Sequence, residues 1–450
     1  MKFGGTSVGS AERIRALSER VKERLAERPV VVVSALGGIT DLLIRGAHLA
    51  LERDPAAEQV VRDVQARHQA VIAELFPTGK NRLIEHVNAI VVELQAFYTG
   101  VHNLGELTPR SLDAISGMGE RLSCEIVAAA LVARGVDARA VDGRTVVITD
   151  ESFGRAIPLP DETGSQVREV LLPLVQARTV PVVGGFIGAT RRRVSTTLGR
   201  GGSDWSAALI GAHLPAEEIQ IWTDVDGIMT VDPRVVAGAR VLPEVSFEEA
   251  AELAYFGAKV LHPATIKPAV EKGIPVRILN SFNPTAPGTV VSRPAPEEAA
   301  AGEPRAVAFK KGITVILISQ PRMLMAHGFV ARVFEVFNRH RTPVDLIATS
   351  EVSISLTVDS AASVPAVRED LTSLGEVQVL DGMAIVSIVG RGFVRRSGLA
   401  ARIFQALRDV NVVMISFGAS DVNLSLVVAE ADAERAIRLL HAEFFEGRAA

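Results

Sequence analysis

Short apolar runs alternate with helix-like segments through the first part of this chain, and this alternation limits its fold more than any other feature. Residues 30–34 read Val-Val-Val-Val-Ser, after a segment that Ser10 can cap and whose apolar residues keep helical spacing up to Leu25. Further strand-like runs lie at residues 180–187, 218–223 and 275–279, and residues 55–103 have the pattern of long amphipathic helices. Strands that are apolar at every position are typical of a mostly parallel sheet with helices on both faces.

The charge and the cysteine content exclude several classes of protein. The 450-residue chain has 48 Lys and Arg against 52 Asp and Glu, so its net charge of −4 leaves no basic excess for nucleic acid or an anionic membrane. The single Cys124 excludes a disulfide within the chain and a CxxC metal site. The most apolar run, residues 30–36, is far below the ~20 residues of a membrane span, and no targeting signal is evident. We therefore expect a cytoplasmic protein.

A linker and an internal repeat organise the rest of the chain. Residues 293–304 carry three prolines among acidic residues and alanines, which indicates an exposed connection. Beyond it, the segment that starts at Gly328 is echoed from Gly398, and the segment at Ser350 from Ser420, each 70 residues later. Each copy has the pattern strand, helix, strand, strand, helix, as in a ferredoxin-like module. The repeat alone does not decide between ligand-binding modules and modules that only pack.

Four glycine-rich turns in the first part of the chain favour a phosphate site. They lie at residues 2–7, 34–40, 117–120 and 198–204. Glycine lets backbone N–H groups approach an oxyanion, and a helix that starts after the turn adds partial positive charge. Residues 205–212 are such a helix-like segment. None of the turns matches a P-loop or a dinucleotide fingerprint, but Lys2, Glu120, Arg200 and Asp204 in or beside them indicate a site for charged groups.

Taken together, these motifs resemble the signatures of the aspartate kinase family. They are Lys2-Phe3-Gly4-Gly5-Thr6-Ser7-Val8, Gly199-Arg200-Gly201-Gly202-Ser203-Asp204, Trp222-Thr223-Asp224-Val225-Asp226-Gly227 with Asp232-Pro233-Arg234, and Phe256-Gly257-Ala258-Lys259-Val260-Leu261-His262-Pro263. The two repeated modules resemble the ACT domains of that family. The resemblance covers essentially the whole chain.

This resemblance implies an α/β architecture and a reaction. It implies an amino-acid-kinase fold, a three-layer αβα sandwich with a mostly parallel sheet, at residues 1–292, a linker at 293–306, and two βαββαβ ACT modules at 307–381 and 382–450. Only Met1 precedes Lys2, so we expect a short first strand, and after the second module we expect no fused homoserine dehydrogenase. The implied reaction transfers a phosphoryl group from ATP to the side-chain carboxylate of L-aspartate, the first step of lysine, threonine and methionine biosynthesis.

The resemblance also implies which residues hold aspartate. Lys2 would bridge the transferring phosphoryl group and the acceptor, with Arg200 and Asp204 completing the catalytic set. Arg200 can clamp the α-carboxylate and Glu120 can accept the ammonium group. Hydroxyl donors to the acceptor would be Ser34, Thr40 and Ser203. Without the resemblance, Glu120 could be a carboxylate favoured by a helix N-terminus and Arg200 a solvated loop charge.

The nucleotide is expected to contact the first turn and three later motifs. The predicted ATP-binding residues are Lys2, Phe3, Gly4, Gly5, Thr223, Asp224, Met229, Arg234 and Lys259. Met229 stands where many relatives have an aromatic residue, and Arg234 and Lys259 could instead form surface ion pairs. No cluster of His and Cys has metal-ligand spacing, so we expect no protein-held metal and Mg²⁺ that arrives on the ATP phosphates.

The first module is expected to bind a feedback amino acid, lysine in preference to threonine. By the resemblance, the effector residues are Met323, Ala326, Gly328, Phe329, Val330, Val344, Asp345, Ser350 and Glu351. Asp345 would take a cationic amine, while Met323 and Phe329 could equally be core residues. The second module has Ile415 at the position of that aspartate and is expected to serve assembly of a homodimer.

Two other functions fit the same sequence. The chain could phosphorylate another amino-acid carboxylate on the same fold, or it could be a catalytically silent amino-acid sensor that keeps the domains for binding and assembly. Release of ADP with aspartate, with glutamate and without an acceptor separates the three hypotheses.

Overall fold

A computed structural model describes residues 1–79, 81–256, 261, 263–293, 302–320, 327–359 and 362–446. The chain divides into two compact units, residues 1–227 with 260–293 and residues 228–259 with 294–450. In this division residues 228–259, which belong to the predicted catalytic domain at 1–292, pack with the C-terminal part. Val231, Val235 and Val236 share an apolar core with the strands and helices of the second repeat, and the N–H of Val307 donates to the carbonyl of Thr230 at 2.7 Å.

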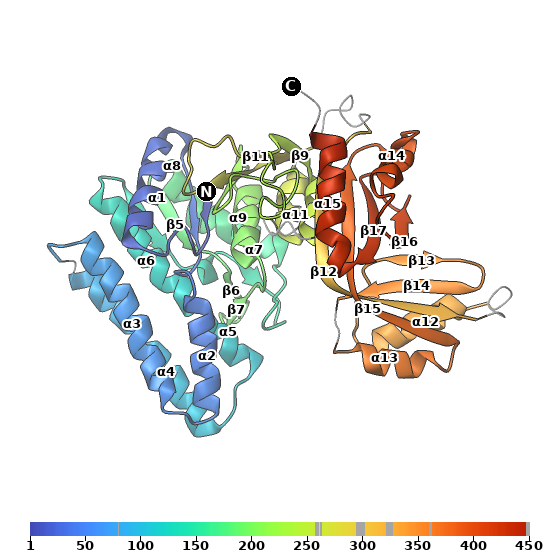
Figure 1. Ribbon diagram of the computed structural model, residues 1–450. Coiled ribbons are helices and arrows are strands. Elements are labelled where there is room, and N and C mark those ends of the chain that lie inside the picture. The colour runs from blue at the N-terminus through green and yellow to red at the C-terminus, as the bar shows by residue number, and fades with distance from the viewer. Residues whose placement is uncertain are drawn as a thin grey trace. The chain divides into compact units, whose positions relative to one another are not determined.

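The main sheet of the first unit is mostly parallel, as the apolar runs predict (Figure 1). Its strand order is β3-β5-β2-β1-β8-β10-β11, and only the β10–β11 pair in this series is antiparallel. The strands are β1 (Lys2–Phe3), β2 (Val31–Val33), β3 (Ala138–Val141), β5 (Val180–Gly184), β8 (Ile219–Thr223), β10 (Val276–Asn280) and β11 (Thr289–Ser292). A second, small sheet has the order β4-β6-β7, with β4 (Ile148–Thr149), β6 (Ile187–Thr190) and β7 (Ser195–Thr197).

Helices pack on both faces of the main sheet. The helices of this unit are α1 (Ala11–Glu23), α2 (Ile39–Leu51), α3 (Ala56–Leu75), α4 (Asn81–Leu104), α5 (Pro109–Ser116), α6 (Met118–Ala133), α7 (Pro160–Gln166), α8 (Leu172–Gln176), α9 (Gly202–His213) and α11 (Pro263–Lys272). Ser10 caps α1 as expected, since its side chain accepts from the N–H of Arg13. In β1, Phe3 belongs to the core under α1 and α6, while Lys2 reaches α9, because successive strand residues point to opposite faces.

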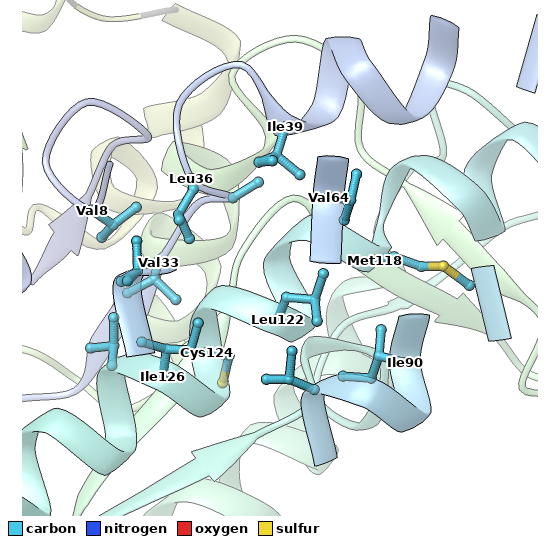
Figure 2. Packing of buried hydrophobic residues seen from close by; sticks show 14 of the residues in the cluster. Val8, Val33, Leu36, Ile39, Val64, Ile90, Met118, Leu122, Cys124 and Ile126 are labelled. Atoms are coloured by element: carbon cyan, nitrogen blue, oxygen red, sulfur yellow. The ribbon is translucent and has the colours of Figure 1, made fainter. Parts of the chain in front are cut away.

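The core between α2, α3, α4 and α6 fixes the position of α6. Figure 2 shows Met118 and Leu122 of α6 among Val64 of α3 and Ile90 of α4, and all four belong to one buried cluster. The core is mainly aliphatic, in keeping with an aromatic content of only 5%. Contact with the turn after β2 is close, because a Cβ at Gly119 would lie 2.6 Å from Ala35 Cβ. The first residues of α6 are therefore held against that turn.

The second unit contains the two repeated modules, and their secondary structure has the predicted order. Both first helices of the repeat start after a glycine with positive φ, Gly328 at 78° and Gly398 at 82°, a conformation that glycine adopts without strain. The first copy has β12 (Pro304–Ser319), α12 (Phe329–Arg339), β13 (Ile347–Thr349), β14 (Ser353–Val358) and α13 (Val364–Leu371). The second has β15 (Glu376–Gly390), α14 (Leu399–Ala406), β16 (Val412–Phe417), β17 (Asn423–Ala429) and α15 (Glu430–Phe445).

The modules share two long strands rather than keeping separate sheets. β12 and β15 pair along most of their lengths, and the sheet order is β13-β14-β12-β15-β17-β16. β12 begins at Pro304, inside the predicted linker at 293–306, of which residues 294–301 lie outside the described part. The inserted segment contributes β9 (Glu244–Ser246) and α10 (Phe247–Tyr255) to this unit. Its Glu249 is bound to Arg391 by a buried ion pair of 2.9 Å, which ties α10 to the sheet.

No helix within the described ranges is long and apolar enough to cross a membrane.

Candidate active site

A cavity of about 540 Å³ lies where β1, β2 and β5 end, at the edge of the sheet where ligands of parallel α/β folds bind. The glycine-rich turns after β1 and β2 and the turn before α9 line it. The sequence-predicted residues that the cavity brings together are Lys2, Gly5, Ser34, Thr40, Glu120, Arg200, Ser203 and Asp204. Two further lining residues, Asp41 and Phe186, were not predicted, since neither lies in a motif that indicates a charged ligand.

Lys2 and Asp204 form the charged centre of this cavity. Lys2 Nζ lies 2.7 Å from Asp204 Oδ1, and the two side chains are 11% and 13% exposed. Asp204 stands in the first turn of α9, which begins at Gly202, three residues before the predicted helix at 205–212 and inside the last glycine-rich turn. Largely removed from water, the ammonium group is fixed in direction and weakly screened. This cation can therefore face an anionic substrate at a defined position.

Glu120 is a buried carboxylate with an unused oxygen. Its Oε1 accepts the N–H of Ala35 at 3.1 Å, while among the described residues no donor reaches Oε2. Burial raises the pKa of Glu120 to about 8, and the Ala35 amide offsets only part of that shift. A buried acceptor without a partner costs free energy unless a ligand supplies the donor. The ammonium group of an amino acid would supply both the hydrogen bond and the opposite charge.

Hydroxyl groups connect the turn after β2 with the start of α9. Ser34 Oγ donates to Ser203 Oγ at 3.0 Å, and Ser123 Oγ of α6 donates to the Ser34 carbonyl at 2.7 Å. Thr40, in the first turn of α2, is half-buried at the cavity wall. Arg200 is exposed at the cavity rim, between Gly199 and Gly201, whose φ angles are 73° and 74°. These positions agree with a small, multiply charged ligand beside Lys2.

The nucleotide residues predicted in the first unit lie at two neighbouring strand ends. The N–H of Gly4 donates to the Trp222 carbonyl at 3.2 Å and is engaged in this conformation, whereas Gly5 lines the cavity. Phe3 stacks on Trp222 with ring centroids 5.7 Å apart, so only its backbone faces the ends of the strands. Thr223 Oγ1 donates to Asp224 Oδ1 at 3.2 Å at the end of β8.

Two polar residues next to these, Asp226 and Asn280, were not among the predicted nucleotide-binding residues. Asn280 Nδ2, at the end of β10, donates to Asp226 Oδ1 at 2.8 Å, and Asn283 Nδ2 donates to the same oxygen at 3.1 Å. The parallel pairing of β8 and β10 brings the two strand ends together. Asp226 was part of a quoted motif, but nothing in the sequence indicated that Asn280 would be its partner.

The remaining predicted nucleotide residues belong to the second unit or lie outside the described residues. Met229 forms an isolated bridge with Val241. Arg234 is 87% exposed and forms an ion pair of 2.6 Å with Asp232. A surface ion pair was the alternative to nucleotide binding that the sequence left open for this residue. Lys259 lies outside the described residues.

The predicted effector residues of the second unit have mixed environments. Phe329 is 3% exposed and belongs to the core of the first module, whereas Val330 is exposed and Val344 packs at the margin of that core. Ser350 Oγ lies 2.7 Å from Ser353 Oγ, and Glu351 is exposed. Met323 and Ala326 lie outside the described residues.

Asp345 is the most distinctive of these residues. Its side chain is 2% exposed, and its Oδ1 lies 3.3 Å from Lys310 Nζ and accepts the hydroxyl of Tyr255. Lys310 also pairs with Asp359 at 3.0 Å and lies 4.8 Å from the centre of the Tyr255 ring. In the described part of the chain, no group donates to Asp345 Oδ2. The carboxylate thus has one oxygen available to an added amine.

Within the described ranges, no three His, Cys, Asp or Glu side chains cluster as ligands of a resident metal ion. The cavity is lined by the cations Lys2 and Arg200 and by the backbone of glycine-rich turns as much as by carboxylates. One of those carboxylates, Asp204, is paired with Lys2. These residues suit a metal ion that arrives on substrate phosphates.

Comparisons with known proteins identify the class to which this fold and cavity belong. Residues 1–280 match the model of the amino acid kinase family, and residues 386–444 match an ACT domain model. A chloroplastic aspartokinase 3 of Arabidopsis thaliana is 38% identical over 99% of this chain and 81% of its own length. Lysine-sensitive aspartokinase 3 of Escherichia coli is 37% identical over 99% of this chain and 98% of its own length. This chain belongs to the aspartokinases within the amino acid kinase family.

Solved structures agree with this assignment. The structure of E. coli aspartokinase III in complex with aspartate and ADP has a TM-score of 0.84, 35% identity and 99% coverage of both chains. The structure of the same enzyme with lysine and aspartate has a TM-score of 0.83 and the same identity and coverage.

Proposed function

We propose that this chain transfers the γ-phosphoryl group of Mg²⁺-ATP to the side-chain carboxylate of L-aspartate, giving 4-phospho-L-aspartate and ADP. The observation that carries this proposal is one cavity lined both by the Lys2–Asp204 pair and by Glu120, whose Oε2 has no donor among the described residues. The activity of the relatives, which are named aspartokinases, supports it.

Charge neutralisation is the main requirement of this reaction. The acceptor carboxylate has an ordinary pKa of about 3.9 and is already ionised near neutral pH, so no general base is needed. As an oxygen of that carboxylate forms its bond to the γ-phosphorus, the bond to the oxygen bridging to the β-phosphate breaks and ADP leaves. In our proposal Lys2 lies between the two anions and reduces their repulsion, and Mg²⁺ enters with the phosphates.

Contacts to the three charged groups of L-aspartate would orient it. Glu120 accepts its ammonium group, and Arg200 binds its α-carboxylate in a bidentate manner. Ser34, Thr40 and Ser203 surround the acceptor carboxylate with hydroxyl groups. For the nucleotide, Thr223 and Asp224 lie at the end of β8, and Met229, Arg234 and Lys259 remain predictions.

A coupled assay of ADP release tests the reaction directly. We expect turnover with L-aspartate, little with L-glutamate, and none without an acceptor. Hydroxylamine should trap the acyl phosphate as a hydroxamate. Turnover with glutamate but not aspartate would mean a kinase of another carboxylate, and ATP binding without turnover would mean a silent sensor.

We further propose that lysine inhibits the enzyme through Asp345, as the lysine-sensitive relative suggests. An incoming amine can bind Asp345 Oδ2, the buried oxygen to which no described residue donates, or compete with Lys310 for Oδ1. The hydroxyl of Tyr255, at the C-terminal end of α10, donates to the same carboxylate. Effector binding at Asp345 would therefore change a contact of α10. A ligand shifts an equilibrium only through such differential contacts.

Asp345→Asn tests this regulatory site. Because an amide cannot neutralise an ammonium group, we expect at least about a tenfold rise in the lysine concentration that halves activity, with kcat nearly unchanged. Asp359→Asn is the matched control, since Asp359 also pairs with Lys310 but is 42% exposed. Threonine is titrated in parallel. Wild-type inhibition by threonine alone, or full lysine sensitivity in Asp345→Asn, would contradict the proposal.

A homodimer formed through the ACT modules is the assembly we propose. β16 is an edge strand of the second unit and exposes Val413, Ile415 and Phe417 in alternation, and β13 at the other edge exposes Ile347. Exposed apolar edge strands invite pairing with another chain.

A single buried Cys124 also suits our proposal of a reducing, cytoplasmic location.

Ile415→Lys tests the dimer. The charge would be desolvated at the proposed interface, so we expect the sedimentation coefficient at micromolar concentration to change from that of a dimer to that of a monomer. Val394→Lys is a control, because Val394 is exposed but lies in a turn before α14. A wild-type monomer, or an Ile415→Lys dimer as tight as the wild type, would refute this assembly.

A further inference from the structure

Asp113 on α5 is a buried carboxylate that the reaction proposed above does not use. Its side chain is held in a cage of donors: the N–H of Gly154 lies 2.9 Å from Oδ2, the N–H of Thr197 lies 3.0 Å from Oδ2, and the Thr197 hydroxyl donates to Oδ1 at 2.6 Å. The residue is 2% exposed, and no ion pair with a basic side chain is found for it in the described part of the chain. Burying a charge without a counterion costs free energy, so we expect a buried carboxylate at this position to have a role in the protein.

The donors of this cage come from segments that lead to the aspartate site. Thr197 is the last residue of β7, and Arg200 follows three residues later. Gly199 packs against the other donor, since a Cβ there would lie 3.2 Å from the Gly154 carbonyl, and its φ of 73° excludes most side chains as well. The carboxylate therefore fixes the base on which the turn carrying Arg200 rests.

Asp113 itself lies seven residues before Glu120, the other charged residue of that site. The helix α5 ends at Ser116, and Gly117 leads directly into α6, whose first turn contains Glu120. The N–H of Gly117 donates to the Asp113 carbonyl at 3.1 Å. One residue thus connects the helix pair that carries Glu120 with the strand that leads into the turn carrying Arg200.

We infer that Asp113 is a positioning residue for the amino-acid substrate, which sets the spacing between Glu120 and Arg200 without touching the ligand. This inference rests on the proposed function, in which Glu120 holds the ammonium group and Arg200 the α-carboxylate of L-aspartate. Those two substrate groups are attached to the same carbon, so both residues can bind them only at one mutual distance. Mg²⁺-ATP has no such requirement at these residues.

Asp113→Asn tests the inference with little change in volume. The asparagine amide can accept both backbone N–H groups only with its N–H₂ facing the Thr197 hydroxyl, which must then accept instead of donate, and without the negative charge every hydrogen bond of the cage is weakened. We expect KM for L-aspartate to rise about tenfold or more, because small displacements of substrate-positioning groups have large effects. The KM for Mg²⁺-ATP should stay within about twofold, a split that a general loss of structure would not produce.

Two companion variants sharpen this test. Thr197→Val removes one donor of the cage and keeps Asp113, so its KM for aspartate should lie between those of wild type and Asp113→Asn. Asp137→Asn is the matched control, because Asp137 accepts the hydroxyl of Thr179 at 2.6 Å but is exposed at the opposite edge of the sheet, before β3. Its KM values should equal those of wild type.

Arg200→Gln separates failure of this inference from failure of the proposed function. If Arg200→Gln leaves the KM for aspartate unchanged, the assignment of Arg200 is wrong. If Arg200→Gln raises it while Asp113→Asn does not, or if Asp113→Asn raises the KM values of both substrates equally, Asp113 is not a positioning residue. Should Asp113→Asn fail to fold, as judged by urea unfolding, Thr197→Val decides alone: a raised KM for aspartate supports the inference and an unchanged one overturns it.

Discussion

Lys2→Met is expected to reduce kcat by about a thousandfold. A cation at ~4 Å from an anion, in surroundings with an effective dielectric constant near 20, contributes about 4 kcal/mol. Since about 1.4 kcal/mol corresponds to a tenfold rate change, losing one such contact to the transferring phosphoryl group costs about three powers of ten. Methionine keeps most of the aliphatic stem and its packing in β1, so the change isolates the charge. Steady-state ADP release and thermal unfolding are measured together.

The control for this prediction is Lys22→Met, on the exposed side of α1, which should keep wild-type rates. Asp204→Asn is informative as well. It removes the carboxylate 2.7 Å from Lys2 Nζ, so we expect an intermediate loss of kcat through disorder of the ammonium group. A Lys2→Met enzyme with kcat within tenfold of wild type would contradict the role proposed for Lys2. Calorimetric binding of ATP to the variant shows whether the nucleotide still enters.

Much of the cavity could be predicted because parallel strands place their carboxyl ends at one edge. Lys2, Ser34 and Arg200 follow or lie in glycine-rich turns far apart in the sequence, yet they line one cavity. Turn chemistry and residue type are local signals, and the fold class supplies the convergence. The contact between the Ala35 amide and Glu120 was not predictable, because it depends on how closely α6 approaches the turn after β2. Nor was Asp113, whose partners are two backbone N–H groups and one hydroxyl.

The partition of the chain was harder to predict than its secondary structure. Residues 228–259 have the same apolar pattern whichever unit they join, and only their long-range partners decide. The contact of Thr230 with Val307 and the buried pair of Glu249 with Arg391 place the segment in the second unit. Likewise, the shared strands β12 and β15 require a register across both modules, which the 70-residue repeat does not encode. Periodicity reports which face of an element is buried but not against which partner.

Glu120→Gln is expected to lower kcat/KM for L-aspartate by about a hundredfold or more, the range for losing a charged hydrogen bond in a buried site. Glutamine can still accept the N–H of Ala35, but it offers no charge to the ammonium group. Glu125→Gln is the matched control and should leave kcat/KM unchanged, because Glu125 lies five residues further along α6 and its side chain is 36% exposed. A Glu120→Gln enzyme with a wild-type KM for aspartate would contradict the assignment.

The pH dependence of the same pair of enzymes gives an independent test. Burial raises the pKa of Glu120 from its usual 4.5 to about 8 in the ligand-free protein, so aspartate must bind the minor, ionised form at neutral pH. In wild type, log kcat/KM for aspartate should therefore rise with pH with a slope approaching one until about pH 8, and Glu120→Gln should lose that slope.

The free energy of unfolding should fall as the pH rises, which is the opposite of the trend in kcat/KM. Because the folded pKa lies above the unfolded one, the contribution of Glu120 to stability is complete below about pH 4.5 and is lost as the pH rises to about 8. Each pH unit in that window removes at most about 1.4 kcal/mol from the free energy of unfolding, and glutamine avoids this loss. Without substrate, the urea midpoint of Glu120→Gln should exceed that of wild type at pH 7.5 and approach it near pH 5. Aspartate at a concentration that saturates the wild type should reduce this difference by stabilising the wild type more than the variant, since the ammonium group then compensates the buried charge.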